Sequence, residues 1–205
     1  MPAFSGLFRL DPVEDPRNAQ ADPDGTGLNR PEDGAWDPSN PNVFYFVTTA
    51  AFRGAVPTFG QNTRLWRLTF ADITQPELGG TVEVVVEGNL DGPQMMDNIT
   101  VDDEGNVYMQ EDPGNNPHIA RIWRYQPATD SVTLLGEHVP ANIPVATNDE
   151  ESSGIIDVTA LFSGVAGYDT AANHYFLFDV QAHYAISSPA ELVEGGQLLM
   201  MKVPR

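Results

Sequence analysis

Residues 101–110 read VDDEGNVYMQ, a polar turn that opens through an asparagine into an aromatic strand. The same pattern occurs twice more, where NVFYFV follows Asp37 and NHYFLF follows Asp169, so the turn aspartates lie 65 and 67 residues apart. A further strand pattern comes later in each unit, as RLWRLTF, RIWRYQ and QLLMMKV. An internal repeat of this size, built from short strands and turns, is typical of β-propeller blades.

The rest of the chain agrees with an all-β fold. Strand patterns follow one another from residue 30 onward, no amphipathic helix pattern is visible, and 17 prolines and 18 glycines suit many turns. We predict about three four-stranded blades over residues 30–205. Residues 1–29 are predicted to be an extended N-terminal segment, in which FSGLFRL at 4–10 could form one strand of a preceding blade.

Three blades are fewer than the roughly four to eight that close a propeller ring. An open series of blades exposes unpaired strand edges, which pair readily with other chains. We therefore expect a homo-oligomer, or a partner that supplies the complementing half of the propeller.

The charge of the chain limits its partners. A net charge of -19 and a pI near 4.2 exclude nucleic acid, whose phosphates would be repelled, and favour cations or a salty medium. The alternative is that the acids serve only solubility. One lysine against nine arginines, with abundant aspartate, favours a salt-adapted exported protein, and the absence of cysteine excludes disulfides and thiolate metal sites.

The first ten residues, MPAFSGLFRL, lack the basic start and sustained apolar core of a signal peptide. No apolar run approaches the roughly 18 residues that a membrane span needs. We expect an extracellular or periplasmic protein whose export signal is absent from this chain, and no membrane span.

The repeat also predicts at which end of the blades each acid lies. The turn aspartates mark one end of every blade, so residues before the first strand of a unit or after the second belong to the other end. Converging carboxylates repel one another unless cations neutralise them, and calcium takes six to eight oxygen ligands. The alternative is a set of ordinary solvated loop acids. The candidate metal ligands at this end are Glu32, Asp97, Asn98, Glu111, Asp112, Glu150 and Glu151, with Asp179 and His183 nearby.

Arg30 lies two residues before Glu32, on this otherwise anionic end. A guanidinium can hold an oxyanion through two hydrogen bonds, so we predict a role in binding or catalysis. The alternative is an ion pair with a neighbouring carboxylate.

The histidines and two adjacent serines are weaker signals. His118, His138 and His174 lack the close pairing of a zinc helix, which favours surface or hydrogen-bonded roles. Ser152 and Ser153 in EESSG have no G-x-S-x-G context and no evident base, which argues against a serine nucleophile.

Several motifs, in order, resemble the carboxy-terminal half of PhoX-type alkaline phosphatases. The motifs are RPEDGAWDP (30–38), VFYFVTT (43–49), RLWRL (64–68), DNITVDDEGNVYMQEDPG (97–114), ARIWRY (120–125), EESSGIID (150–157) and FLFDVQAHY with ELVEGGQLLMMKVP (176–204). The resemblance implies a six-bladed propeller, exported, that hydrolyses phosphomonoesters with a calcium and iron cofactor. It further implies that Arg30 holds phosphate and that Glu32 binds metal.

This chain departs from the family in lacking the cysteine that ligates iron. The hypothesis is accordingly a PhoX-like metal-dependent phosphomonoesterase, or a carboxy-terminal portion of one, with Arg30 and Glu32 as catalytic residues and calcium as the metal. The alternatives are a non-catalytic calcium-binding propeller module that self-assembles through open strand edges, and a propeller lactonase or esterase.

Overall fold

The computed structural model describes residues 4–6, 28–50, 62–89, 91–114, 116–139, 150–185 and 194–205. Within these ranges the chain is all-β, and its only helices are two short 3-10 turns, η2 (Pro76–Leu78) and η4 (Thr159–Phe162). The predicted all-β class is therefore confirmed. Most of the predicted N-terminal segment, residues 1–3 and 7–27, lies outside the described residues.

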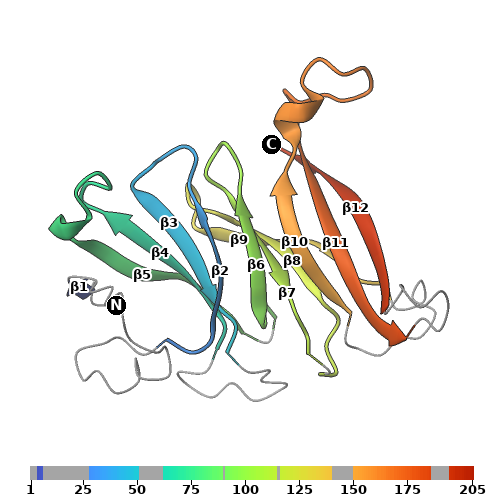
Figure 1. Ribbon diagram of the computed structural model, residues 1–205, viewed down its shortest axis with the longest axis horizontal. Helices are drawn as coiled ribbons and strands as arrows, with labels where there is room; N and C mark the ends of the chain where they lie inside the picture. The colour runs from blue at the N-terminus through green and yellow to red at the C-terminus, as the bar shows by residue number, and fades with distance from the viewer. Residues whose placement is uncertain are drawn as a thin grey trace.

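The strands form three antiparallel sheets (Figure 1). The first has the order β1-β5-β4-β3-β2, the second β6-β7-β8-β9 and the third β10-β11-β12. Their bounds are β1 Phe4–Gly6, β2 Pro31–Trp36, β3 Val43–Thr48, β4 Arg64–Phe70, β5 Gly80–Glu87, β6 Met96–Val101, β7 Val107–Glu111, β8 Arg121–Gln126, β9 Ser131–Glu137, β10 Glu151–Asp157, β11 Asn173–Ala185 and β12 Glu194–Pro204.

The sheets stand side by side like the blades of an open fan (Figure 1). Strand β6, an edge strand of the second sheet, lies against β2 and β10, which are edge strands of the neighbouring sheets. This is how blades of a propeller meet, but the described strands close no ring. A propeller arrangement remains a prediction.

Strand numbers differ from four in two of the sheets. Strand β1 pairs with β5, with Phe4 opposite Val82, and so adds a fifth strand to the first sheet. Residues 4–6 thus join the first predicted blade rather than a preceding one, because the edge of β5 offers free backbone groups. The third sheet has three described strands, of which β11 and β12 form a long hairpin.

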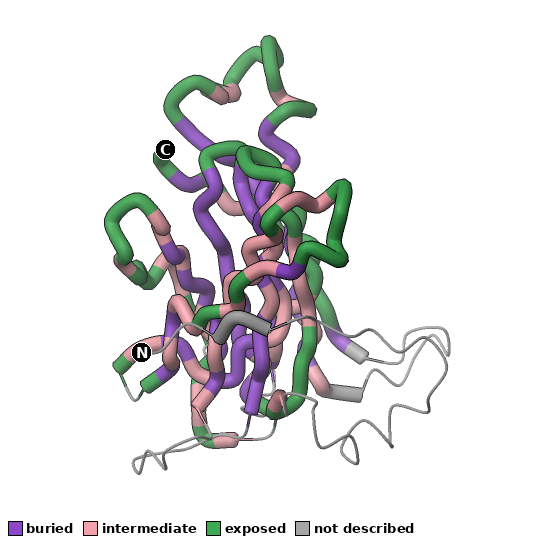
Figure 2. Tube along the Cα trace, turned by 90° about the vertical axis from the view of Figure 1, so that its left-hand side faces the viewer, coloured by how far each residue is buried: buried purple, intermediate pink, exposed green. Residues whose placement is uncertain are grey.

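Alternating residues build the core between the sheets. Val43, Tyr45 and Val47 on β3 are buried with Met109 and Trp123 of the second sheet. Tyr108, the residue next to Met109, faces the other way, and its ring packs against Phe176 with centroids 4.2 Å apart. Buried positions therefore follow the strands, while most positions in the described connections are exposed or partly exposed (Figure 2).

Candidate functional site

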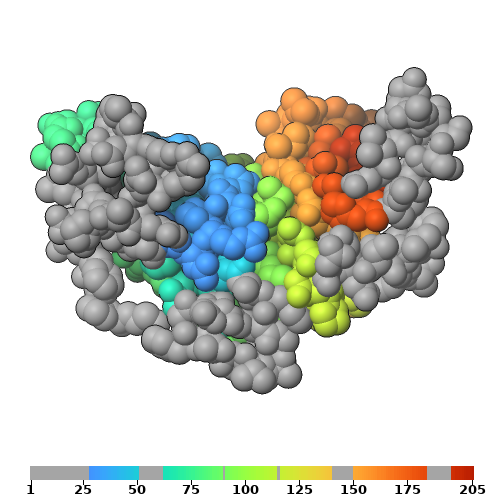
Figure 3. All heavy atoms as spheres, turned by 60° about the horizontal axis from the view of Figure 1, so that its bottom comes forward, coloured from blue at the N-terminus to red at the C-terminus, as the bar shows by residue number. Residues whose placement is uncertain are grey.

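The two ends of the fan are chemically different. We call the end that carries residues 37–42, 102–106 and 158–172 the turn end, because these segments join β2 to β3, β6 to β7 and β10 to β11 (Figure 1). Gly105 has a φ of 82°, and a Cβ on it would lie 3.2 Å from Asp37 Oδ2, so the first two turns touch. The opposite end, where β2, β6 and β10 begin, is the acid end. It faces the viewer in Figure 3.

Four acids of the acid end form one electrostatic group, which we call the acid cluster: Glu32, Asp97, Asp112 and Glu151. Burial, followed by the charges of Glu32 and Asp112, raises the pKa of Asp97 to about 6. Burial, followed by the charge of Asp112 and a hydrogen bond with it, raises the pKa of Glu151 to about 7. Carboxylates from three sheets thus influence one another's charge at this end.

An irregularity in strand register accompanies the acids in every sheet. The pairing shifts between Pro31 and Gly34 on β2, and between Met96 and Asn98 on β6. On β10 it shifts between Ser153 and Ile155, where Gly154 takes a φ of 48°. Because a β-bulge turns side chains away from the regular alternation, these shifts help to aim the acids at one another.

Arg30 stands beside the acid cluster with its side chain 63% exposed. Its Nη1 donates to Ala50 O at 3.1 Å, and its Nη2 lies 3.5 Å from Glu32 Oε1. The charge of Arg30 lowers the pKa of Asp97 against the stronger influences that raise it. The ion pair that the sequence offered as the alternative role of Arg30 is present, and much of the side chain still faces solvent.

Glu111, another predicted metal ligand, serves a different network. Its fully buried carboxylate accepts hydrogen bonds from Gln94 N, Arg121 N and Trp123 Nε1, at 2.7, 3.0 and 2.8 Å. It also lies 2.7 Å from His118 Nε2. These contacts occupy both carboxylate oxygens and tie together parts of the second sheet and its connections. Glu111 is therefore distinct from the acid cluster.

The remaining predicted ligands are Asn98 and Glu150. The side-chain amide oxygen of Asn98, Oδ1, is buried and accepts no hydrogen bond within the described residues, so it is a candidate ligand. Glu150 is buried. Burial lowers the pKa of His138, and the charge of Glu150 partly opposes that shift. At the edge of the cluster, His183 Nε2 lies 3.9 Å from Glu151 Oε2.

One further pair of residues was not predicted from the sequence. His138 Nε2 lies 2.8 Å from Ser152 Oγ, although the two residues belong to different sheets. A base for Ser152 is therefore present after all. However, Ser152 is fully buried, so its hydroxyl is not presented to a substrate and the contact joins the second and third sheets.

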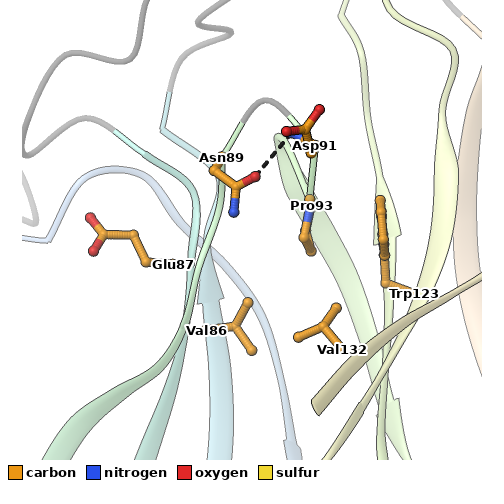
Figure 4. A pocket seen from close by; sticks show the side chains of 8 residues that line it. Val86, Glu87, Asn89, Asp91, Pro93, Trp123 and Val132 are labelled. Carbon is orange, nitrogen blue, oxygen red and sulfur yellow. Dashed lines mark hydrogen bonds between the residues drawn. The ribbon is translucent and has the colours of Figure 1, made fainter. Parts of the chain in front are cut away.

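A hollow of about 280 Å³ lies between the first and second sheets (Figure 4). Val86, Trp123 and Val132 form its apolar walls, and Glu87, Asn89 and Asp91 lie at its mouth. Asp91 N donates to Asn89 Oδ1 at 2.9 Å. The hollow contains no member of the acid cluster, so the candidate site is the cluster itself.

No protein-family model and no curated protein matches this chain. The PhoX resemblance therefore stays a prediction that rests on the motifs. Among the described residues, no helix is long and apolar enough to cross a membrane.

Proposed function

We propose that this chain is a PhoX-like metal-dependent phosphomonoesterase, or a carboxy-terminal portion of one, that binds a divalent cation at the acid cluster. The observation that carries the proposal is the convergence of Glu32, Asp97, Asp112 and Glu151 from three sheets. Two of these carboxyl groups have pKa values raised toward neutrality. A bound cation would relieve the repulsion that contributes to those shifts.

The donors of the acid cluster fit calcium. They are carboxylate oxygens, and the unpartnered Asn98 carbonyl oxygen could join them. Calcium prefers six to eight oxygen ligands and tolerates irregular geometry, whereas softer metals prefer nitrogen or sulfur. With no cysteine in the chain, the family's iron ligand is missing, so calcium is the cofactor we propose.

Arg30 supplies the anion-binding part of the proposal. Its Nη1 is held by Ala50 O, which fixes the guanidinium, while the rest of the side chain stays open to solvent beside Glu32. A phosphoryl group could therefore meet Arg30 and the cation together. A bound cation would polarise the phosphoryl oxygens, and Arg30 would stabilise the charge that develops on them.

Calcium binding and turnover can be tested in turn. Excess chelator should lower the melting temperature, because a ligand bound only by the folded protein stabilises it, and calcium should restore it. Hydrolysis of a chromogenic phosphomonoester should require calcium and be lost in Asp97→Asn. The matched control is Asp91→Asn, which removes an exposed acid from the mouth of the hollow. A melting curve unchanged by chelator would exclude the calcium site.

The edge of the third sheet favours a second candidate, a non-catalytic calcium-binding module that self-assembles. Strand β12 pairs only with β11 in the described sheet and carries Leu198, Leu199 and Met200, which are 75%, 37% and 47% exposed. Calcium-dependent stability without phosphomonoester hydrolysis, together with a solution mass above 22.3 kDa, would support this candidate over the enzyme.

A further inference from the structure

His174 on β11 is fully buried, yet neither of its ring nitrogens makes a hydrogen bond within the described residues. The sequence favoured surface or hydrogen-bonded histidines. That expectation holds for His118 and His138, which contact Glu111 and Ser152, and it is wrong for His174. A buried imidazole without a hydrogen-bond partner is rare enough to require an explanation.

Carboxylates surround both ring nitrogens of His174. Nε2 lies 3.3 Å from Asp102 Oδ2 and 3.9 Å from Glu104 Oε2. Nδ1 lies 3.6 Å from Asp157 Oδ2 and 3.8 Å from Asp103 Oδ1. These acids come from the β6–β7 turn and from the end of β10, so the surroundings of His174 join the second and third sheets.

One cation already balances part of this charge. Arg205 Nη1 lies 2.9 Å from Asp103 Oδ1 and 2.8 Å from Glu104 Oε1. In their charged forms, four carboxylates and one guanidinium leave a net charge of -3 around His174. A divalent cation would neutralise most of it.

The spacing of the atoms suits a metal better than hydrogen bonds. One ligand atom from each of Asp102, Asp103 and His174 lies within 4.8 Å of the other two. Around a tetrahedral zinc with bonds of about 2.0 to 2.2 Å, neighbouring ligands lie roughly 3.3 to 3.6 Å apart. Asp102 Oδ2 lies at 3.3 Å from Nε2, within this range, whereas Asp103 Oδ1 lies 3.8 Å from Nδ1. A cation on one ring nitrogen therefore takes the carboxylate of that side directly, and the other carboxylate joins it when its side chain moves.

Asp102 is also held in place as a ligand would be. Its Oδ1 accepts from Glu104 N and Asn106 N, and its Oδ2 accepts from Asn106 Nδ2 and the Tyr108 hydroxyl at 2.9 Å. Burial, with the charge of Asp102, raises the pKa of Tyr108 well above its usual value, so the phenol remains a donor. Such outer contacts orient the carboxylate.

We infer that His174, Asp102 and Asp103 form a second metal site, at the turn end, for a zinc-like divalent cation. The nitrogen ligand distinguishes it from the all-oxygen acid cluster at the other end, since imidazole suits zinc and related metals better than calcium. The cation ties the β6–β7 turn to β11 and so fixes the third sheet against the second. The site does not depend on the proposed phosphatase function.

The test compares zinc chloride with calcium chloride on protein stripped of metal by a chelator. Zinc should raise the melting temperature of the wild type by several degrees, and X-ray absorption should find nitrogen among the zinc neighbours at about 2.0 to 2.1 Å. Both signals should be lost in His174→Gln. Calcium, which we propose to bind at the acid cluster, should raise the melting temperature by the same amount in the wild type and in His174→Gln.

Two further variants guard against misfolding and against binding elsewhere. Asp103→Asn changes a side chain that is 64% exposed, and it should weaken zinc binding at least tenfold without unfolding the protein. Asp130→Asn, in the neighbouring β8–β9 turn, should bind zinc like the wild type. Zinc that leaves the wild-type melting temperature unchanged, or binding that is unaffected in His174→Gln and Asp103→Asn, would overturn the proposal.

Discussion

At the scale of single residues, the acid cluster has a measurable consequence for stability. Asp97 has a pKa of about 6 in the folded protein, against 3.8 in its unperturbed state. The folded state therefore binds more protons than the unfolded state between about pH 4 and pH 6. Stability from this group is greatest below pH 4 and is lost as the pH rises through 6.

Asp97→Asn should consequently stabilise the metal-free protein at pH 8 and leave it nearly unchanged at pH 4. We expect a gain of about 1 kcal/mol, less than the whole pKa shift would give, because solvent screens a half-exposed side chain. Urea unfolding in excess chelator at both pH values measures it. With calcium present, Asp97→Asn should instead destabilise the protein. A gain that is equal at pH 4 and pH 8 would contradict the electrostatic explanation.

Arg30 gives a second prediction at this scale. Its Nη1 is held by Ala50 O and its Nη2 stands near Glu32, so a lysine would keep the charge but not the planar pair of donors. Arg30→Lys should bind phosphate or vanadate at least tenfold more weakly, as measured by calorimetry. The control is Arg67→Lys, on the first sheet, where the guanidinium pairs with Glu83 at 2.6 Å. Equal oxyanion affinity in Arg30→Lys and the wild type would leave Arg30 a purely structural role.

At the scale of elements, the register shift on β10 helps to position Glu151 at the acid end. Gly154 has a φ of 48°, and a Cβ there would lie 2.7 Å from Asp179 Oδ1. Gly154→Ala should cost about 1 to 2 kcal/mol, since an alanine is strained in the left-handed region. It should also weaken calcium binding, because Glu151 lies three residues earlier on the same strand.

Gly136→Ala on β9 is the matched control for this prediction. A Cβ at Gly136 would meet no atom within 4 Å, and its backbone has no positive φ. Urea unfolding should therefore show little change, or a small gain from reduced freedom of the unfolded chain. Equal losses in the two variants would mean that the bulge at Gly154 holds no special position.

At the scale of the whole molecule, the exposed edge of the third sheet predicts that copies of this chain associate. Strand β12 lies at the edge of the third sheet, and its Leu198 and Met200 are 75% and 47% exposed. Light scattering at micromolar concentration should therefore give a mass above 22.3 kDa. Leu198→Lys should shift the protein toward the monomer, whereas Leu161→Lys, at an equally exposed position in η4, should not. A stable wild-type monomer that unfolds cooperatively would contradict the prediction.

The sequence alone determined the class of fold and the sorting of the acids. Alternating apolar positions and polar turns define strands locally, and a repeated turn places Asp37 and Asp102 at the same end of neighbouring sheets. Acids on the other side of each turn, such as Asp97 and Glu151, must then share the opposite end. The local residue pattern and the spacing of the repeated turns were sufficient for this inference.

Only the tertiary structure decided which acids act together. Glu111 and Asp112 are adjacent in the sequence, yet Glu111 is enclosed by donors of the second sheet while Asp112 acts on Asp97 and Glu151. His174 likewise meets its acids only where two sheets face each other. The physical reason is that register, bulges and the packing of sheets fix where a side chain points, and these depend on residues far away in the chain.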